Sequence, residues 1–259
     1  MIKTLTATRY LTPLREGGSL PAIVEADDAN LYVMKFVGAG QGRKALIAEW
    51  VAGEIGRTLG LPVPEMVLLE LDPALVPSEP DPEIYDLLRF SVGLNLGLRY
   101  LPQAFMFNPL LPPAPGPELA SAIVWFDAYV TNVDRTPRNV NILVWQNGLW
   151  LIDHGACLYF HHQWKGYLDK SRNPFPAIKD HALLPFATKL DEADASLRSR
   201  LTPEVIERIV KDIPEFWLEG EDFFPDTVQQ RQGYIDFLQS RLKAAPAFVG
   251  EAKSAQHSL

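Results

Sequence analysis

Alternating apolar and polar residues predict short strands around one helix in the first part of the chain. Two β-rich runs, residues 22–25 and 31–37, are separated by the polar turn Ala26-Asp27-Asp28-Ala29-Asn30. Apolar residues then recur every four positions from residue 43 to 59, which predicts a helix. We expect the next strand at residues 64–71, after a Gly-Leu-Pro sequence that ends the helix.

A proline-rich stretch separates this region from one with helical periodicity. Residues 72–82 are rich in Pro, Asp and Glu and are expected to form a surface loop, followed by a strand within residues 90–101. The stretch Asn-Pro-Leu-Leu-Pro-Pro-Ala-Pro-Gly-Pro at residues 108–117 excludes helix interior and central strand. We therefore place a boundary slightly upstream, between an N-lobe at 1–101 and a C-lobe at 102–259.

Helical patterns dominate the second region. We expect a mostly buried helix at residues 118–130 and amphipathic helices at 203–218 and 227–245, with Asp226 capping the last of them. Residues 251–259 are expected to fray. The predicted fold class is α+β, with a small β-rich N-lobe that contains one main helix and a larger, mostly helical C-lobe.

Composition narrows the class of protein. The 259 residues are 47% hydrophobic and 22% charged, which is ordinary for a globular chain, and no apolar run is long enough to span a membrane. Residues 1–15 lack the apolar core of a signal peptide, and the single Cys157 cannot form an internal disulfide, so we expect a cytoplasmic protein. The net charge of -8 and the absence of a basic block argue against direct nucleic-acid binding.

The most informative stretch runs from residue 126 to 155. A predicted buried helix leads into a polar loop with Asp134 and Asn139, and two strands then deliver Asp153-His154-Gly155. Phosphoryl transfer requires metal ions held by oxygen ligands, which Asn139 and Asp153 could supply, and a carboxylate such as Asp134 to accept the proton of the acceptor hydroxyl. Gly155 would permit a sharp turn after the metal ligand.

Asp-x4-Asn alone is a weak signal, because Asp and Asn are also favoured in loops for backbone capping. The following hairpin that ends in Asp-x-Gly makes the combination more specific.

A lysine in the first region provides a separate indication. Lys35 interrupts an apolar strand and, by alternation, shares the face of Leu31 and Val33, which would normally be buried. A buried lysine needs an anionic partner, and ATP phosphates with a helix glutamate, Glu49 or alternatively Glu54, would satisfy it. The competing interpretation is a surface lysine on an edge strand. Upstream, Gly17, Gly18 and Ser19 could form a loop whose backbone N–H groups approach phosphates.

These residues resemble the HipA-like kinases and, more distantly, lipid kinases and aminoglycoside phosphotransferases. The resemblance rests on Asn132–Leu143, Leu151–Gly155, Val33–Phe36 and Leu59–Glu65. It implies a protein-kinase-like fold that binds ATP and Mg²⁺. Lys35 would hold the ATP phosphates and Glu49 would position Lys35, while Asp134 would be the catalytic base and Asn139 and Asp153 the magnesium ligands.

The resemblance also sets limits on the expected function. The chain has Asn132-Val133-Asp134 where ordinary protein kinases have His-Arg-Asp, and Asp153-His154-Gly155 where they have Asp-Phe-Gly. Better-known family members phosphorylate protein Ser/Thr hydroxyls, and some are toxins with a small DNA-binding antitoxin, but this chain looks too short for the extra N-terminal subdomain of the longer toxins. We therefore expect an ATP-dependent kinase that acts on a protein hydroxyl. The alternatives are a small-molecule kinase and a nucleotide-binding pseudokinase.

Other residues admit simpler interpretations. Arg135 and Arg138 could balance phosphate charge or lie on the surface. A zinc site at the three neighbouring histidines is disfavoured, because the adjacent His161 and His162 would point apart on a strand. The aromatic residues Trp125, Phe126 and Tyr129 fit a buried helix better than a stacking site. Residues 160–184 occupy the position of an activation or substrate loop.

Overall fold

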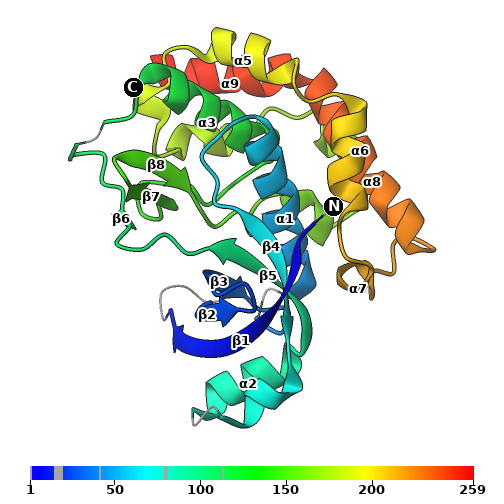
Figure 1. The fold of residues 1–259 in the computed structure, drawn as a ribbon. Helices are drawn as coiled ribbons and strands as arrows, with labels where there is room; N and C mark the ends of the chain where they lie inside the picture. Colours follow the sequence, from blue (N-terminus) through cyan, green and yellow to red (C-terminus); the bar gives the residue numbers. More distant parts are fainter. Residues whose placement is uncertain (1, 15–19, 41, 79–80, 113) are drawn as a thin grey trace.

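The computed structural model describes residues 2–14, 20–40, 42–78, 81–112 and 114–259. The suggested glycine-rich loop, Gly17, Gly18 and Ser19, lies outside these residues. The fold is mixed α+β, with a β-rich N-terminal part and a helical remainder (Figure 1). Among the described residues, no helix is both long and apolar enough to cross a membrane.

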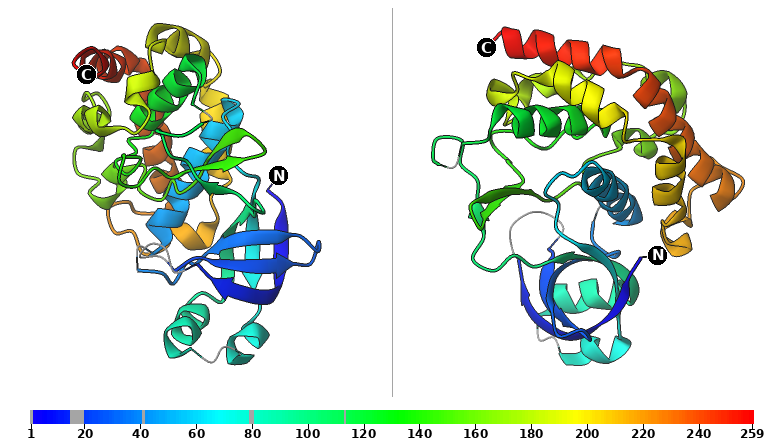
Figure 2. Two further views of the ribbon diagram at one scale, coloured as in Figure 1. Left: turned by 90° about the vertical axis from the view of Figure 1, so that its left-hand side faces the viewer. Right: turned by 45° about the horizontal axis from the view of Figure 1, so that its top comes forward.

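The N-terminal strands form a closed barrel in the order β1-β2-β3-β5-β4, visible end-on in Figure 2. The strands are β1 (Thr4–Pro13), β2 (Ala22–Ala26), β3 (Leu31–Lys35), β4 (Met66–Leu71) and β5 (Gly93–Arg99). All neighbours are antiparallel except β1 and β4, whose parallel pairing closes the ring. The strands predicted at residues 22–25 and 64–71 are therefore confirmed as β2 and β4. The strand β1 was not predicted.

The barrel has its own apolar core, to which β3 contributes Tyr32 and Met34. These two side chains are fully buried, whereas Leu31, Val33 and Lys35 are only partly buried on the opposite face of the strand. The expectation that Lys35 lies on the more buried face is therefore wrong. Lys35 instead points away from the barrel interior, because Tyr32 and Met34, the alternate residues of the strand, face the inside of the closed barrel.

A short helical layer covers one end of the barrel. It consists of a 3₁₀ helix, η1 (Pro73–Ser78), and of α2 (Pro82–Phe90), which lies at the bottom of Figure 1. The α2 residues Ile84 and Leu88 are buried in the barrel core. The loop expected at residues 72–82 is thus replaced by helical structure. Asp81 caps α2 by accepting a hydrogen bond from the Glu83 amide, and Pro82 occupies the first turn.

The helix α1 (Gly42–Thr58) packs in a second, larger core together with the C-terminal helices. Trp50 on α1 donates a hydrogen bond from Nε1 to the carbonyl of Ile209, at 3.2 Å. At the start of the helix, Lys44 Nζ lies 2.9 Å from a carboxylate oxygen of Glu221 and 2.7 Å from the carbonyl of His161. Polar contacts and apolar packing therefore fix α1 to the helical part of the chain, beside which it runs in Figure 1.

The part of the chain after the barrel also contains a three-stranded sheet in the order β6-β7-β8. Its strands are β6 (Phe105–Met106), β7 (Ile142–Trp145) and β8 (Gly148–Leu151), and the expected turn between the last two contains Gln146 and Asn147 with positive φ. The buried helix predicted at residues 118–130 is confirmed as α3 (Pro117–Tyr129), with Pro117 in its first turn. Trp125, Phe126 and Tyr129 lie in the core, as the helical spacing predicts.

The remaining helices differ from the predictions in two places. The elements are η2 (Tyr159–His162), α4 (Tyr167–Lys170), η3 (Pro176–Asp180), η4 (Leu184–Phe186), α5 (Leu190–Arg198), α6 (Pro203–Lys211), α7 (Glu215–Leu218), α8 (Thr227–Lys243) and α9 (Ala245–His257). The single helix expected at 203–218 is divided into α6 and α7, because Pro214 cannot continue a helix. The tail expected to fray is helical instead, since Phe248, Val249 and Ala252 of α9 are buried.

Candidate active site

Lys35 at the end of β3 joins the barrel to the helical part through two ion pairs. Its Nζ lies 2.5 Å from Oε2 of Glu49 on α1 and 2.6 Å from Oδ1 of Asp153, which follows β8. The Lys35 side chain is 14% exposed, so the interpretation as a surface lysine does not hold. Lys35 and Asp153 are 118 positions apart in the sequence, whereas Glu49 lies 14 positions after Lys35.

Glu49 is the partner of Lys35, and the alternative Glu54 is engaged elsewhere. Glu54 pairs with Arg57 on the same helix, at 3.1 Å. Burial alone would raise the pKa of Glu49, but Lys35 and the neighbouring His154 together outweigh burial, and the pKa lies below its ordinary value. Burial likewise opposes the charge on Lys35, yet Glu49 and Asp153 together hold the pKa of Lys35 above its ordinary value. Lys35 and Glu49 are therefore both charged at neutral pH.

His154 is a second neighbour of Glu49, a contact that the sequence analysis did not predict. Its Nδ1 lies 3.4 Å from Oε1 of Glu49, and both side chains are fully buried. The ring of His154 packs edge-on against Phe126, with the ring centres 5.7 Å apart. Within the described part of the chain, neither His154 nitrogen nor Glu49 Oε1 makes a hydrogen bond. His154 Nδ1 and Glu49 Oε1 face each other, and a small rotation of either side chain would let them form a hydrogen bond.

The polar loop after α3 orients Asp134. Asn139 donates a hydrogen bond from Nδ2 to Asp134 Oδ2 at 2.7 Å, and Asn141 donates to the same oxygen at 3.2 Å. The Asp134 amide donates to Asn132 Oδ1 at 3.0 Å. No hydrogen bond involves Asp134 Oδ1 in the described part of the chain. One oxygen of the carboxylate is thus fixed by two amides, and the other is free to bind a ligand.

The loop is held by a buried carboxylate on α3. Asp127 accepts hydrogen bonds from Asn132 at 2.8 Å and from Arg135 at 2.6 Å, and His181 Nε2 lies 2.9 Å from its Oδ2. Burial would raise the pKa of Asp127, but Arg135 and His181 together outweigh burial, and the pKa lies below its ordinary value. Arg135 is fully buried, so both roles considered for it, at the surface or beside phosphates, are wrong. Arg138 is exposed.

Backbone pairing brings the residue before Asp153 beside Asn141, whose side chain binds Asp134. The Ile152 amide donates to the Asn141 carbonyl at 3.1 Å, so Asp153 follows directly after the residue paired with Asn141. Arg135 Nη1 also donates to the carbonyls of Asn141 and Ile152. The turn expected at Gly155 is present and is closed by a hydrogen bond from the Cys157 amide to the His154 carbonyl at 2.9 Å, and Asp153 just before it has a left-handed φ of 57°. A non-glycine residue in this conformation is uncommon and is found at functional sites.

Asn139 and Asp153 each retain a free oxygen that could coordinate a magnesium ion. Asn139 uses Nδ2 to bind Asp134, and Asp153 uses Oδ1 to bind Lys35, which leaves Asn139 Oδ1 and Asp153 Oδ2 without hydrogen bonds in the described part of the chain. No three His, Cys, Asp or Glu side chains among the described residues form a metal-binding group. This donor set fits Mg²⁺, which is held by one or two protein oxygens and completed by phosphates.

Comparison with known proteins identifies a matching family and a similar solved structure. The family model for HipA-like kinase matches residues 8–248 of this chain. The chain is similar in structure to the crystal structure of a proinflammatory kinase, CtkA, from Helicobacter pylori, with a TM-score of 0.58 and 13% sequence identity. The similarity covers 100% of this chain and 98% of that one. No curated protein sequence matches the chain.

Proposed function

The chain belongs to the HipA-like kinase family, and we propose on this basis that it transfers the γ-phosphoryl group of ATP to a hydroxyl group. The observation that carries the proposal is the contact of Lys35 with both Glu49 and Asp153. In this contact the ammonium group of Lys35, from the barrel, lies beside the carboxylate of Asp153, the proposed magnesium ligand from the helical part. Such an arrangement suits a ligand that carries both phosphates and a bound cation.

Lys35 is the residue that binds the ATP phosphates in this proposal. Its ammonium group is held in place by Glu49, which is buried in a helix that cannot readily shift. The pair keeps the ammonium charged, since the pKa of Lys35 lies above its ordinary value. Lys35 can therefore exchange its contact with Asp153 for phosphate oxygens while retaining Glu49 as its partner.

Asn139 and Asp153 hold the magnesium ion in this proposal. When bound, the ion neutralises phosphate charge and polarises the phosphoryl group for transfer. The role of the protein is to present the free Asn139 Oδ1 and Asp153 Oδ2 from segments fixed by the β7–β8 hairpin. The left-handed backbone at Asp153 gives its carboxylate a direction set by the fold.

Asp134 orients the acceptor hydroxyl and accepts its proton. Two amides bind Asp134 Oδ2, and the free Oδ1 can bind the incoming hydroxyl. The two amides neutralise part of the carboxylate charge without blocking it, which is the arrangement expected of a positioned base. The acceptor that we propose is a hydroxyl on a protein, by analogy with the family members that the sequence resembles.

Incubation of the purified protein with Mg²⁺ and γ-labelled ATP tests the proposal. We expect label on the protein itself or on a protein acceptor, and loss of that label in Asp134→Asn. The exposed Asp222→Asn is the matched control, because it makes the same chemical change away from the site. Equal labelling by wild type and Asp134→Asn would refute the assignment. Mg-ATP binding without transfer, measured by thermal stabilisation, would identify a pseudokinase.

A further inference from the structure

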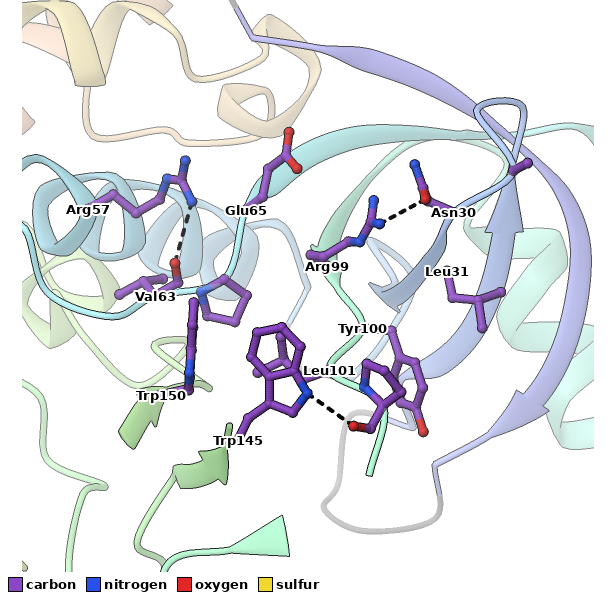
Figure 3. Close-up of a pocket in the computed structure, with 13 residues that line it drawn as sticks. Asn30, Leu31, Arg57, Val63, Glu65, Arg99, Tyr100, Leu101, Trp145 and Trp150 are labelled. Atoms are coloured by element: carbon purple, nitrogen blue, oxygen red, sulfur yellow. Dashed lines mark hydrogen bonds between the residues drawn. The ribbon is translucent and has the colours of Figure 1, made fainter. Parts of the chain in front are cut away.

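A second pocket lies behind the segment that joins the barrel to the helical part. Its volume is about 600 Å³, within the range of protein pockets that bind ligands. Figure 3 shows Tyr100, Trp145 and Trp150 along one side, with Arg57, Glu65 and Arg99 along the other. None of these residues belongs to the candidate active site. The pocket is therefore amphipathic, with an aromatic wall and a charged wall.

The tryptophans of the chain that are not buried in the core line this pocket. The chain has six tryptophans. Four of them, Trp50, Trp125, Trp164 and Trp217, are buried in the core. The other two, Trp145 and Trp150, are half-buried and line the same pocket. Partly exposed Trp, Tyr and Arg side chains clustered in one hollow are the composition of binding hot spots.

The pocket walls are fixed before any ligand arrives. Trp145 Nε1 donates to the Pro102 carbonyl at 3.0 Å, and the rings of Trp145 and Trp150 pack edge-to-face with centres 5.4 Å apart. Arg99 Nη2 donates to Asn30 Oδ1 at 2.7 Å, and its guanidinium lies 5.7 Å from the centre of the Tyr32 ring. Rigid side chains lose little conformational entropy on binding, which favours affinity.

The charged wall contains a cation without an anionic partner. Arg57 pairs with Glu54, whereas the contacts of Arg99 are with the neutral Asn30 and Tyr32. No carboxylate lies within ion-pair distance of Arg99 among the described residues. A chain with a net charge of -8 thus presents an unneutralised guanidinium beside an aromatic wall. A carboxylate is the complementary group, since it accepts hydrogen bonds from the guanidinium in a defined geometry.

We propose that this pocket docks a proline-containing, acidic peptide segment of a partner protein. The aromatic wall, with Pro64 and Pro102 beside it, offers the flat apolar surface on which extended proline segments bind, and Arg99 would bind an acidic side chain of the segment. Arg57, Glu65 and Pro102 are exposed, so the pocket is open to an extended chain. Docking here does not depend on phosphoryl transfer.

Selection from a library of short random peptides on the full-length protein tests this proposal. We expect the recovered peptides to carry proline and Asp or Glu, and to bind wild type at least about tenfold more tightly than Trp145→Ala. Arg99→Gln keeps a hydrogen-bond donor for Asn30 but removes the charge, and it should weaken binding similarly. The matched control is Arg89→Gln on the distant helix α2, which should bind the peptides as wild type does.

Fluorine NMR of the wild-type chain labelled with 5-fluorotryptophan provides a readout that needs no variant. Of the six tryptophan signals, those of Trp145 and Trp150 should shift on addition of a selected peptide. Failure to recover peptides that discriminate wild type from Trp145→Ala would overturn the proposal, as would selection of basic peptides or shifts confined to the buried tryptophans. Self-association that is lost in Trp145→Ala would assign the pocket to a second copy of this chain, and the proposed partner would then be wrong. Mg-ATP binding should be the same with and without peptide in every case.

Discussion

His154 faces Glu49 across 3.4 Å inside a core that excludes solvent. Glu49 Oε2 is occupied by Lys35, so His154 is the group positioned to hold Oε1. The histidine that replaces an aromatic residue in Asp153-His154-Gly155 is therefore placed to orient the carboxylate that orients Lys35. Substitutions of His154 can separate the effect of a hydrogen bond to Glu49 from the effect of the space that its ring fills.

We expect His154→Phe to weaken Mg-ATP binding and to lower stability. The phenyl ring fills the space but leaves Glu49 Oε1 buried without a donor, at a cost of about 1–3 kcal/mol. His154→Gln should restore much of the loss, because its amide can donate to Oε1. Calorimetric binding and urea unfolding would measure both effects. Equal behaviour of the two variants would show that His154 only fills space.

The Lys35–Glu49 pair should be required for nucleotide binding, and Glu54 should not. We expect Lys35→Met and Glu49→Gln to lower kinase activity on the order of a hundredfold, the loss typical of a removed electrostatic contact. Glu54→Gln makes the matched change on the same helix, where the carboxylate pairs with Arg57, and should leave activity nearly unchanged. A loss of activity in Glu54→Gln as large as in Glu49→Gln would contradict the assignment.

The two asparagines beside Asp134 should have different effects when changed. Asn139→Ala removes a proposed metal ligand, so we expect the Mg²⁺ requirement to rise about tenfold or more. Asn141→Ala removes a hydrogen bond to Asp134 but no metal oxygen, so kcat should fall at an unchanged Mg²⁺ requirement. Magnesium titrations of initial rate distinguish these outcomes. The same shift in both variants would mean that Asn141 also contributes to metal binding.

Acid should destabilise the folded chain through Asp127. Its pKa is lower in the folded chain than the ordinary value near 3.9, so Asp127 stabilises the fold above that pH, and this contribution is lost as the pH falls toward the folded pKa. Asp127→Asn removes the titration and should flatten the fall in unfolding free energy below about pH 5. It also leaves Arg135 buried without a carboxylate, which should cost about 3–5 kcal/mol.

Urea unfolding of wild type, Asp127→Asn and the exposed control Asp222→Asn across this pH range measures both effects. Parallel pH profiles for wild type and Asp127→Asn would show that other carboxyl groups dominate the acid response.

The sequence was sufficient to predict features that depend on residues close together in the chain. Lys35 stands out because a charge interrupts an apolar strand, and Asp134, Asn139 and Asp153 stand out because a loop and a hairpin set their spacing. The assignment of roles to these residues stays a prediction, as does the division of the chain at residue 101. The structure adds the contacts that join Lys35 to Glu49 and Asp153.

The sequence analysis did not predict features that depend on packing between residues far apart in the chain. Arg135 was expected either beside phosphates or at the surface, because its burial with Asp127 also depends on His181, 54 positions after Asp127. The pairing of β1 with β4 closes the barrel and decides which face of β3 turns inward. The helix α9 forms where a polar tail was expected, because Phe248 and its neighbours are covered by other helices.

The embedding of α1 among the C-terminal helices has a consequence for control of the protein. Moving this helix outward would expose Trp50 and break the contacts of Lys44 with Glu221 and with the His161 carbonyl. Such a rearrangement would leave these polar groups without their partners and would uncover the apolar core beneath the helix, and both changes oppose it. An inactive form of this protein should therefore retain the helix in place and differ in whether ATP or acceptor can enter.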